Sequence, residues 1–110
     1  MLNQTVLVGR IVENPTIKEL EDGKKVSNIT LAVPRSFKNL DGEYDTDFID
    51  CVLWKTIAES TCEYCKKGDL VGVKGRLQTR SIELEDGSTK KYMEVIAEKV
   101  TFLSTKKEEE

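Results

Sequence analysis

The chain has 110 residues, of which 38% are hydrophobic, so it can bury one modest core and has no room for a second domain. Its 17 basic and 20 acidic residues give a net charge of -3, which argues weakly against a polyanionic partner unless the cations cluster. No apolar run approaches the roughly 20 residues that span a bilayer, and the first residues form neither a signal nor a transit peptide, so we expect an intracellular protein.

The first third of the chain predicts a meander of three strands. The apolar run within residues 2–12 is too continuous for a strand with one wet face, so we expect both faces to be covered, and the second cover could be another subunit. Gly9 allows a bend or a close approach of backbone there. Strands at residues 16–20 and 26–33 flank an Asp-Gly hairpin signal at residues 22–23.

A polar loop is predicted over residues 34–45, because Pro34 ends the preceding strand and Asp-Gly marks a turn. The loop carries a basic-aromatic-basic group made of Arg35, Phe37 and Lys38. Side chains on a loop have no core to fill, so this group is a candidate binding site.

Side chains alternate along the strand predicted at residues 47–54, which gives it one apolar and one mixed face. The apolar face holds Ile49, Cys51 and Leu53, and the mixed face holds Phe48, Asp50, Val52 and Trp54. A buried face would hardly tolerate Asp50 without a partner, so we expect the mixed face to be open. Phe48 and Trp54, roughly 20 Å apart along it, could each stack on a base, or could simply cover a neighbouring element.

From residue 56 the apolar period becomes helical, with two rows spaced i, i+4, i+7. The rows are Ile57, Thr61 and Tyr64, and Ala58, Cys62 and Cys65. We expect a helix of about three turns, capped by Thr56 with Glu59 and ended by the Lys-Lys-Gly of residues 66–68.

The chain has three cysteines, an odd number that argues against a disulfide framework. Zinc at Cys62-x-x-Cys65 would need further ligands, but there is no His, and the remaining cysteine, Cys51, faces the core. The pair also lies near the end of its helix, away from the N-terminus where the dipole lowers a thiol pKa. We therefore expect core-facing thiols and no metal or cofactor.

Residues 69–78 return to the period of a strand, which places Lys74 and Arg76 on one face, joined by Arg80 if the strand continues. These three cations form a positive track or an ordinary solvated face. A hairpin around the Asp-Gly of residues 86–87 and a last strand at residues 92–103 complete the pattern.

This order of elements is typical of an all-β, five-stranded Greek-key barrel of the OB type, with one short helix between the third and fourth strands. Such barrels commonly bind oligonucleotides or oligosaccharides. We expect residues 1–103 to form this domain and residues 104–110, which lack apolar side chains, to be a disordered charged tail.

Several blocks, in order and well separated, resemble the bacterial and bacteriophage single-stranded DNA-binding proteins over residues 1 to about 103. The blocks are Met1-Leu2-Asn3, Val6-Leu7-Val8-Gly9-Arg10, Asn28-Ile29-Thr30-Leu31-Ala32-Val33, the strand at 47–54, Tyr64-Cys65-Lys66-Lys67-Gly68 and Val73-Lys74-Gly75-Arg76-Leu77-Gln78-Thr79-Arg80. The resemblance implies an OB-fold, usually a homotetramer, that wraps single-stranded DNA without sequence preference during replication, recombination and repair.

The resemblance also implies a set of site residues. Its stacking aromatics fall on Phe48, Trp54 and, on the loop, Phe37, whereas a fourth position falls on Ile82, which cannot stack in the same way. The candidate phosphate contacts are Arg35, Lys38, Lys67, Lys74, Arg76 and Arg80. Asp50 stands where some relatives carry a basic residue, which would weaken the attraction for DNA.

Members of that family commonly continue through a Gly/Gln/Pro-rich linker to an acidic tip ending in Pro-Phe, which recruits replication and repair proteins. This sequence ends at Glu110 without such a tip, through truncation or as a short form, so recruitment of those partners is not assumed. We expect a location in the bacterial cytoplasm, at the nucleoid or in a phage-infected host cell.

Two other classes of function stay open. An OB-type protein-interaction module with weak or no DNA binding is favoured by the acidic balance, Asp50 and Ile82. An enzyme is not expected, because the acids Asp45, Asp47 and Asp50 stand without a His, a phosphate-binding loop or an activated nucleophile.

Overall fold

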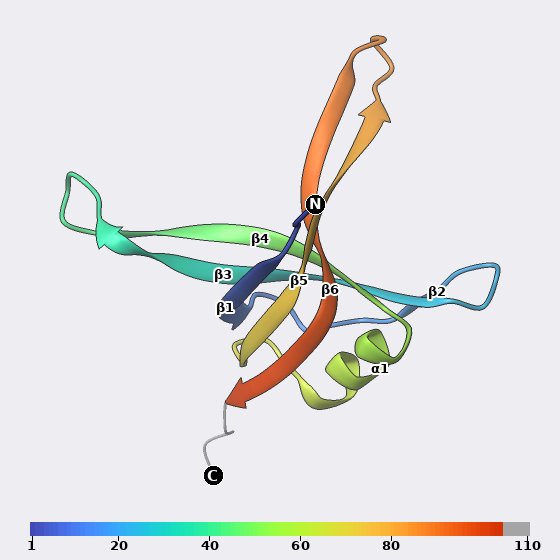
Figure 1. The fold of residues 1–110 in the computed structure, drawn as a ribbon, viewed down its shortest axis with the longest axis horizontal. Helices are drawn as coiled ribbons and strands as arrows, with labels where there is room; N and C mark the ends of the chain where they lie inside the picture. The colour runs from blue at the N-terminus through green and yellow to red at the C-terminus, as the bar shows by residue number, and fades with distance from the viewer. Residues whose placement is uncertain (105–110) are drawn as a thin grey trace.

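Six strands and one helix make up residues 1–104, the part of the chain that the computed structural model describes (Figure 1). The elements are β1 (Thr5–Ile11), β2 (Lys18–Glu19), β3 (Lys25–Lys38), β4 (Tyr44–Trp54), α1 (Lys55–Tyr64), β5 (Leu70–Glu83) and β6 (Thr89–Ser104). The expected tail lies, except for Ser104, outside the described residues. Within the described part, no helix is long and apolar enough to cross a membrane.

The strand order is β1-β5-β6-β4-β3-β2, and the sheet closes into a barrel because β1 pairs with β3 as well as with β5. β1 runs antiparallel to β5 along most of its length and meets β3 at Arg10 and Ile11. A short parallel pairing of β4 with β6, through Cys51 and Val95, joins the two hairpins. Since β2 is only a two-residue extension beside β3, the barrel has five main strands, which confirms the expected fold class.

Two glycines allow the strands to approach closely enough for closure. A Cβ on Gly9 would lie 2.7 Å from the carbonyl oxygen of Ala32, where β1 leaves β5 for β3. A Cβ on Gly75 would lie 2.1 Å from the carbonyl oxygen of Ile96, beside a register shift between β5 and β6. Both separations exclude a side chain, and the bulge at Gly75 bends the long β5–β6 hairpin.

The interior is filled by small and branched apolar side chains from every main strand and from α1. The buried cluster comprises Ile11, Ile29, Leu31, Cys51, Leu53, Ala58, Cys65, Val71, Val73, Val95 and Ala97. Ile49 packs against it half-buried, so the predicted apolar face of residues 47–54 is confirmed.

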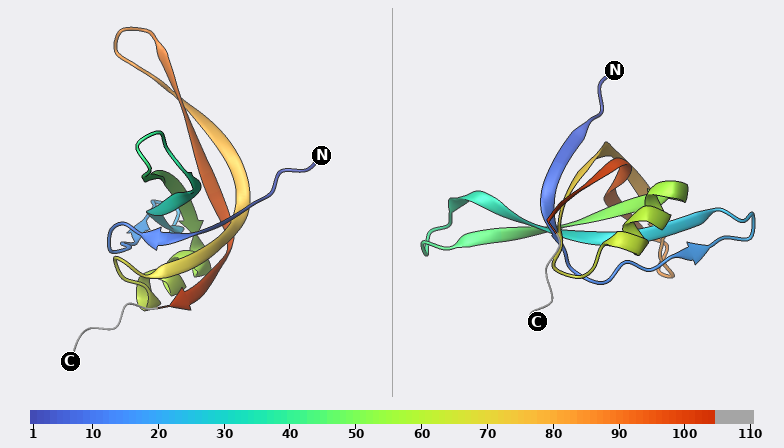
Figure 2. Two further views of the ribbon diagram at one scale, coloured as in Figure 1. Left: turned by 90° about the vertical axis from the view of Figure 1, so that its left-hand side faces the viewer. Right: turned by 90° about the horizontal axis from the view of Figure 1, so that it is seen from below.

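The β3–β4 and β5–β6 hairpins extend beyond the barrel as arms, and the β2–β3 hairpin projects on the side opposite the β3–β4 loop (Figures 1 and 2). The arm of β3 and β4 corrects the prediction that Pro34 ends a strand, because β3 continues to Lys38 and only residues 39–43 form a loop. Pro34 has no N–H to donate, and it is tolerated because the register shifts between it and Lys38. In the β5–β6 arm, likewise, the strands are longer than predicted. β5 continues to Glu83 and β6 begins at Thr89, so that only residues 84–88 form the predicted turn.

The predicted helix caps are wrong. The N-cap is Trp54, in extended conformation and without a side-chain hydrogen bond, so Thr56 lies inside the first turn. The chain turns abruptly from β4 into α1 at Lys55, whose φ of 57° is uncommon for a residue with a Cβ. At the other end the helix stops at Tyr64, before the lysines of residues 66–67.

The prediction that the first strand is covered on both faces is also wrong for the single chain. Val6 and Val8 are 67% and 49% exposed, although Gly9 and Ile11 on the same strand are buried. One face of β1 therefore presents two valines to the surroundings, and the predicted alternative of a subunit interface stays open.

Candidate nucleic-acid interface

Phe48 and Trp54 project from the mixed face of β4. Phe48 is 66% exposed and Trp54 is half-buried, while Val52 between them is covered. Cross-strand pairing places Phe48 opposite Ala32 and Trp54 opposite Val26 on β3. Phe48 therefore stands open above the sheet, and Trp54 keeps part of its ring exposed at the end of the strand.

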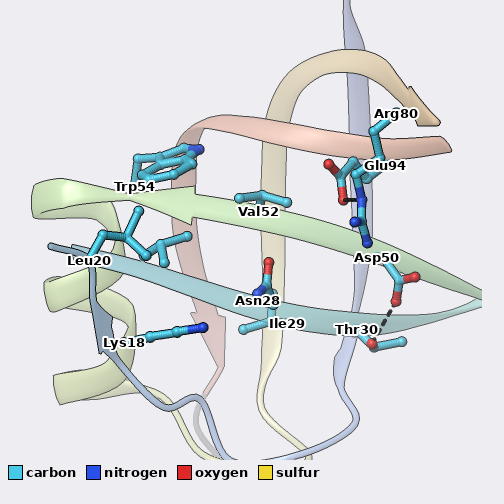
Figure 3. A pocket seen from close by; sticks show the side chains of 11 residues that line it. Lys18, Leu20, Asn28, Ile29, Thr30, Asp50, Val52, Trp54, Arg80 and Glu94 are labelled. Atoms are coloured by element: carbon cyan, nitrogen blue, oxygen red, sulfur yellow. Dashed lines mark hydrogen bonds and ion pairs between the residues drawn. The ribbon is translucent and has the colours of Figure 1, made fainter. Parts of the chain in front are cut away.

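An open groove of about 560 Å³ runs over this face, between the β3–β4 sheet and the β5–β6 arm (Figure 3). Its lining includes Trp54, Val52 and Asp50 of β4, Asn28 and Thr30 of β3, Lys18 and Leu20 from the segment around β2, and Arg80 and Glu94 from the arm. A groove that combines an aromatic ring, amide and hydroxyl groups and a guanidinium has the composition of a site for unpaired nucleotides.

A second groove of about 260 Å³ begins on the other side of Asp50. Phe48 lines it together with the apolar side chains of Leu77 and Met93 from the arm. Asp50 and Glu94 line both grooves, so they separate a space beside Trp54 from a space beside Phe48.

Asp50 is exposed on this face, and its carboxylate has one hydrogen-bond partner within the chain. The Thr30 hydroxyl donates a hydrogen bond of 2.9 Å to Asp50 Oδ1, directly across the strand pair (Figure 3). This bond fixes the orientation of the carboxylate without neutralising its charge.

Arg80 is the predicted cation that lies in the larger groove. Its Nε lies 3.5 Å from Glu94 Oε2, and its guanidinium carbon lies 5.1 Å from the centre of the Tyr92 ring. Lys90 Nζ lies at the same distance from that ring. The arm thus gathers two cations around Tyr92, a residue that the pattern of the sequence placed only in a strand.

Lys74 and Arg76 are exposed on the same strand as Arg80, as predicted, but line neither groove. Lys74 pairs with Val6 of β1 and Lys99 of β6, and Arg76 Nη1 donates to Gln78 Oε1 at 2.7 Å. The three cations therefore lead from the β1 side of the barrel toward the larger groove, and do not form one compact cluster.

The group predicted on a loop, Arg35, Phe37 and Lys38, lies on the β3–β4 arm. Its three side chains have different contacts. Phe37 is 65% exposed, and Lys38 Nζ lies 5.9 Å from the centre of the Tyr44 ring. Arg35 is already engaged, because it donates two hydrogen bonds of 3.0 and 3.1 Å to Asp47 and lies 3.8 Å from Asp45. The hydrogen bond from Arg35 holds the pKa of Asp47 below its ordinary value.

Lys67 lies at the C-terminal side of α1, outside the strands and arms that carry the other predicted phosphate contacts. It follows α1, its backbone N–H donates to Asn14 Oδ1 at 2.8 Å, and it lines neither groove. Ile82 is exposed on the arm, where it pairs with Lys90.

The thiols show no sign of a metal or redox centre within the described residues. Burial raises the pKa of Cys51 to about 12 and that of Cys65 to about 11, so both are protonated at neutral pH and are poor ligands. Cys62 Sγ contacts Ser27 Oγ at 3.5 Å. Within residues 1–104, no group of three or more His, Cys, Asp or Glu side chains could hold a metal ion.

Sequence reasoning missed residues that other elements bring to the larger groove, namely Lys18, Asn28, Thr30 and Glu94. It also missed the role of Tyr92, which lies beside Arg80 outside the groove lining. One signal could have found Asn28 and Thr30, since the hairpin of β3 and β4 sets them opposite Val52 and Asp50. Glu94 reaches the groove from the β5–β6 arm, which lies far from β3 and β4 along the chain.

Comparison with known proteins gives one consistent result. The model of the Single-strand binding protein family matches residues 2–103. The chain is 48% identical over 109 residues to Single-stranded DNA-binding protein B of Bacillus subtilis (strain 168), covering 99% of this chain and 96% of that protein. It is 47% identical over 106 residues to the Single-stranded DNA-binding protein of Oceanobacillus iheyensis, covering 96% of this chain and 66%, about two thirds, of the relative.

Among solved structures, the chain is similar to the Plasmodium falciparum SSB in its complex with ssDNA. The TM-score is 0.82 at 29% sequence identity, over 94% of this chain and 96% of that one. The shared architecture therefore extends over almost the whole chain.

Proposed function

The chain belongs to the single-strand binding protein family, and we propose that it binds single-stranded DNA by stacking unpaired bases on Phe48 and Trp54. The observation that supports this most is that both rings stand on one face of β4, each in its own open groove. Stacking is available to every base, so binding does not require a particular sequence. In duplex DNA the base faces are already stacked, which makes single strands the preferred ligand.

Cations beside the rings would hold the phosphate chain. Arg80 lines the larger groove, and Arg76 and Lys74 continue along β5. Neutralising phosphates releases condensed counterions, so affinity falls as salt rises. Lys38 and Phe37 extend the proposed contact surface along the β3–β4 arm, while Arg35 contributes less because two aspartates already engage it.

The proposed role is to cover and protect exposed single strands during DNA replication, recombination and repair in the bacterial cytoplasm. It consists of binding alone and includes no catalytic step. The partner that the comparisons support is single-stranded DNA, the ligand with which the similar Plasmodium falciparum protein was solved.

We also propose that the chain assembles with copies of itself, as a homotetramer. The exposed valines of β1 support this, because an apolar strand face without a cover in the monomer suits an interface between subunits. Joining several binding faces would let one DNA strand engage them in turn and raise the overall affinity through effective concentration.

A titration of labelled oligo-dT by fluorescence anisotropy tests the function, with a duplex of equal length in parallel. We expect binding to the single strand and quenching of the Trp54 fluorescence by unlabelled oligo-dT but not by duplex. No preference for oligo-dT over duplex at low salt would contradict the proposed function.

A further inference from the structure

Asp50 occupies a position from which it would meet the edge of a bound base. It lies two residues from Phe48 and four from Trp54 on the same strand face, roughly 7 and 13 Å along β4. It also lines both grooves. A DNA strand with bases stacked on both rings would therefore pass next to this carboxylate.

The carboxylate is held ready to accept hydrogen bonds. Thr30 Oγ1 donates to Asp50 Oδ1, which leaves the second oxygen and further lone pairs open. Within residues 1–104 no ion pair engages Asp50, in contrast to Glu94, which lies 3.5 Å from Arg80 and has a side chain only 14% exposed. Of the two carboxylates between the grooves, Asp50 is the one available to a ligand.

An ionised carboxylate accepts hydrogen bonds and cannot donate them, so it discriminates between base edges. Cytosine presents an exocyclic amino group at C4, which is a donor, whereas uracil and thymine present a carbonyl oxygen there. An amino group would bond to Asp50, while a carbonyl would place two acceptors together without a proton.

We propose that Asp50, positioned by Thr30, gives this chain a preference for cytosine over thymine or uracil at the nucleotide between Phe48 and Trp54. The inference rests on the proposed binding of single-stranded DNA. It adds a bias in base composition to an interaction whose stacking contacts are insensitive to sequence.

A simpler role for Asp50 would be repulsion of the phosphate chain. Repulsion weakens binding to every strand by the same factor, because all strands carry the same phosphates. The ratio of two dissociation constants cancels that factor, so the ratio for oligo-dU over oligo-dC isolates the contact with the base edge.

The test measures this ratio by anisotropy at one fixed salt concentration, for the parent chain and for Asp50→Ala. We expect Asp50→Ala to lower the ratio by about threefold to tenfold, the range for the net contribution of one solvent-exposed hydrogen bond. Oligo-dT serves as a third ligand, which shows whether the C5 methyl group contributes. Asp41→Ala removes the same charge from the loop of the β3–β4 arm and should leave the ratio unchanged.

A second variant, Thr30→Val, keeps the shape and the strand preference of the side chain but removes the hydroxyl that orients Asp50. We expect it to lower the ratio in the same direction, and it carries the test if Asp50→Ala fails to fold by circular dichroism. A ratio that neither variant changes would overturn the inference while the proposed function stands. Absence of binding to all three oligonucleotides by the folded parent chain would instead reject the proposed function itself.

Discussion

Trp54 is the only tryptophan of the chain and lies where β4 ends and α1 begins, over the larger groove. We expect Trp54→Ala to weaken binding of labelled oligo-dT by about 1 to 3 kcal/mol, because it removes one stacking surface. Anisotropy measures the loss, and circular dichroism checks the fold. Tyr64→Ala is the matched control, since this exposed ring on α1 lines neither groove and should leave the affinity unchanged. Unchanged affinity for a folded Trp54→Ala would remove Trp54 from the interface.

Two exposed arginines test whether a cation must be free of a carboxylate partner to serve as a phosphate contact, since Arg76 bonds to the neutral Gln78 and Arg35 bonds to Asp47. Arg76→Ala should reduce the slope of log affinity against log salt by about 0.7, the value for one phosphate contact on a single strand. Arg35→Ala should change the slope much less, because Asp47 already binds that guanidinium at 3.0 Å. The measurement is an oligo-dT titration over a series of salt concentrations. Equal losses in the two variants would contradict this distinction.

The Arg35–Asp47 pair makes the end of the β3–β4 arm sensitive to acid. The hydrogen bond from Arg35 lowers the pKa of Asp47 below 3.8, so its contribution is complete above that value and is lost as the pH falls through the lowered pKa. An NMR titration of the Asp47 carboxyl should therefore have its midpoint below 3.8 in the parent chain. In Arg35→Ala the midpoint should rise toward 3.8, and coincident curves for the two chains would show that the pair does not persist in solution.

Among the elements, the β5–β6 arm depends on a tight contact at its base. Gly75→Ala should destabilise the fold by about 1 to 3 kcal/mol or more, because the new methyl group meets the carbonyl oxygen of Ile96 at 2.1 Å. Gly72→Ala, on the same strand, has 3.7 Å to its nearest neighbour and should change little. Urea unfolding gives both free energies, and equal values would show that the arm adjusts without cost.

The ends of the strands show which turn signals in the sequence predict correctly and which do not. The turns at residues 22–23 and 86–87 form where Asp-Gly predicts them, since Gly23 and Gly87 take the positive φ that these turns require. The signal of Pro34 failed because a cross-strand partner, Thr46, keeps β3 paired past it. Continued pairing along a hairpin depends on the opposite strand, which a local pattern does not describe.

For the whole molecule, the proposed assembly rests on the exposed face of β1. Replacing both Val6 and Val8 by Asp should reduce the mass in light scattering from about four times the 12.5 kDa chain to that of smaller species, because an unpaired charge is costly in an apolar interface. Leu40→Asp, at a still more exposed apolar residue on the loop of the β3–β4 arm, should not change the mass. A parent chain that is already monomeric would reject assembly through β1.

The alternation that buries Cys51 and Leu53 and lifts Phe48 and Trp54 above the sheet could be predicted from the amino acids alone, because neighbouring side chains of a strand must point to opposite faces. The order of strands and helix could also be predicted, because the spacing of apolar residues within a short segment is enough to indicate a strand or a helix. That Thr30 orients Asp50, that Glu94 engages Arg80 and that Val6 is exposed became visible only in the folded chain. These contacts depend on the register and curvature of strands distant along the sequence, which are set by the closing of the barrel as a whole.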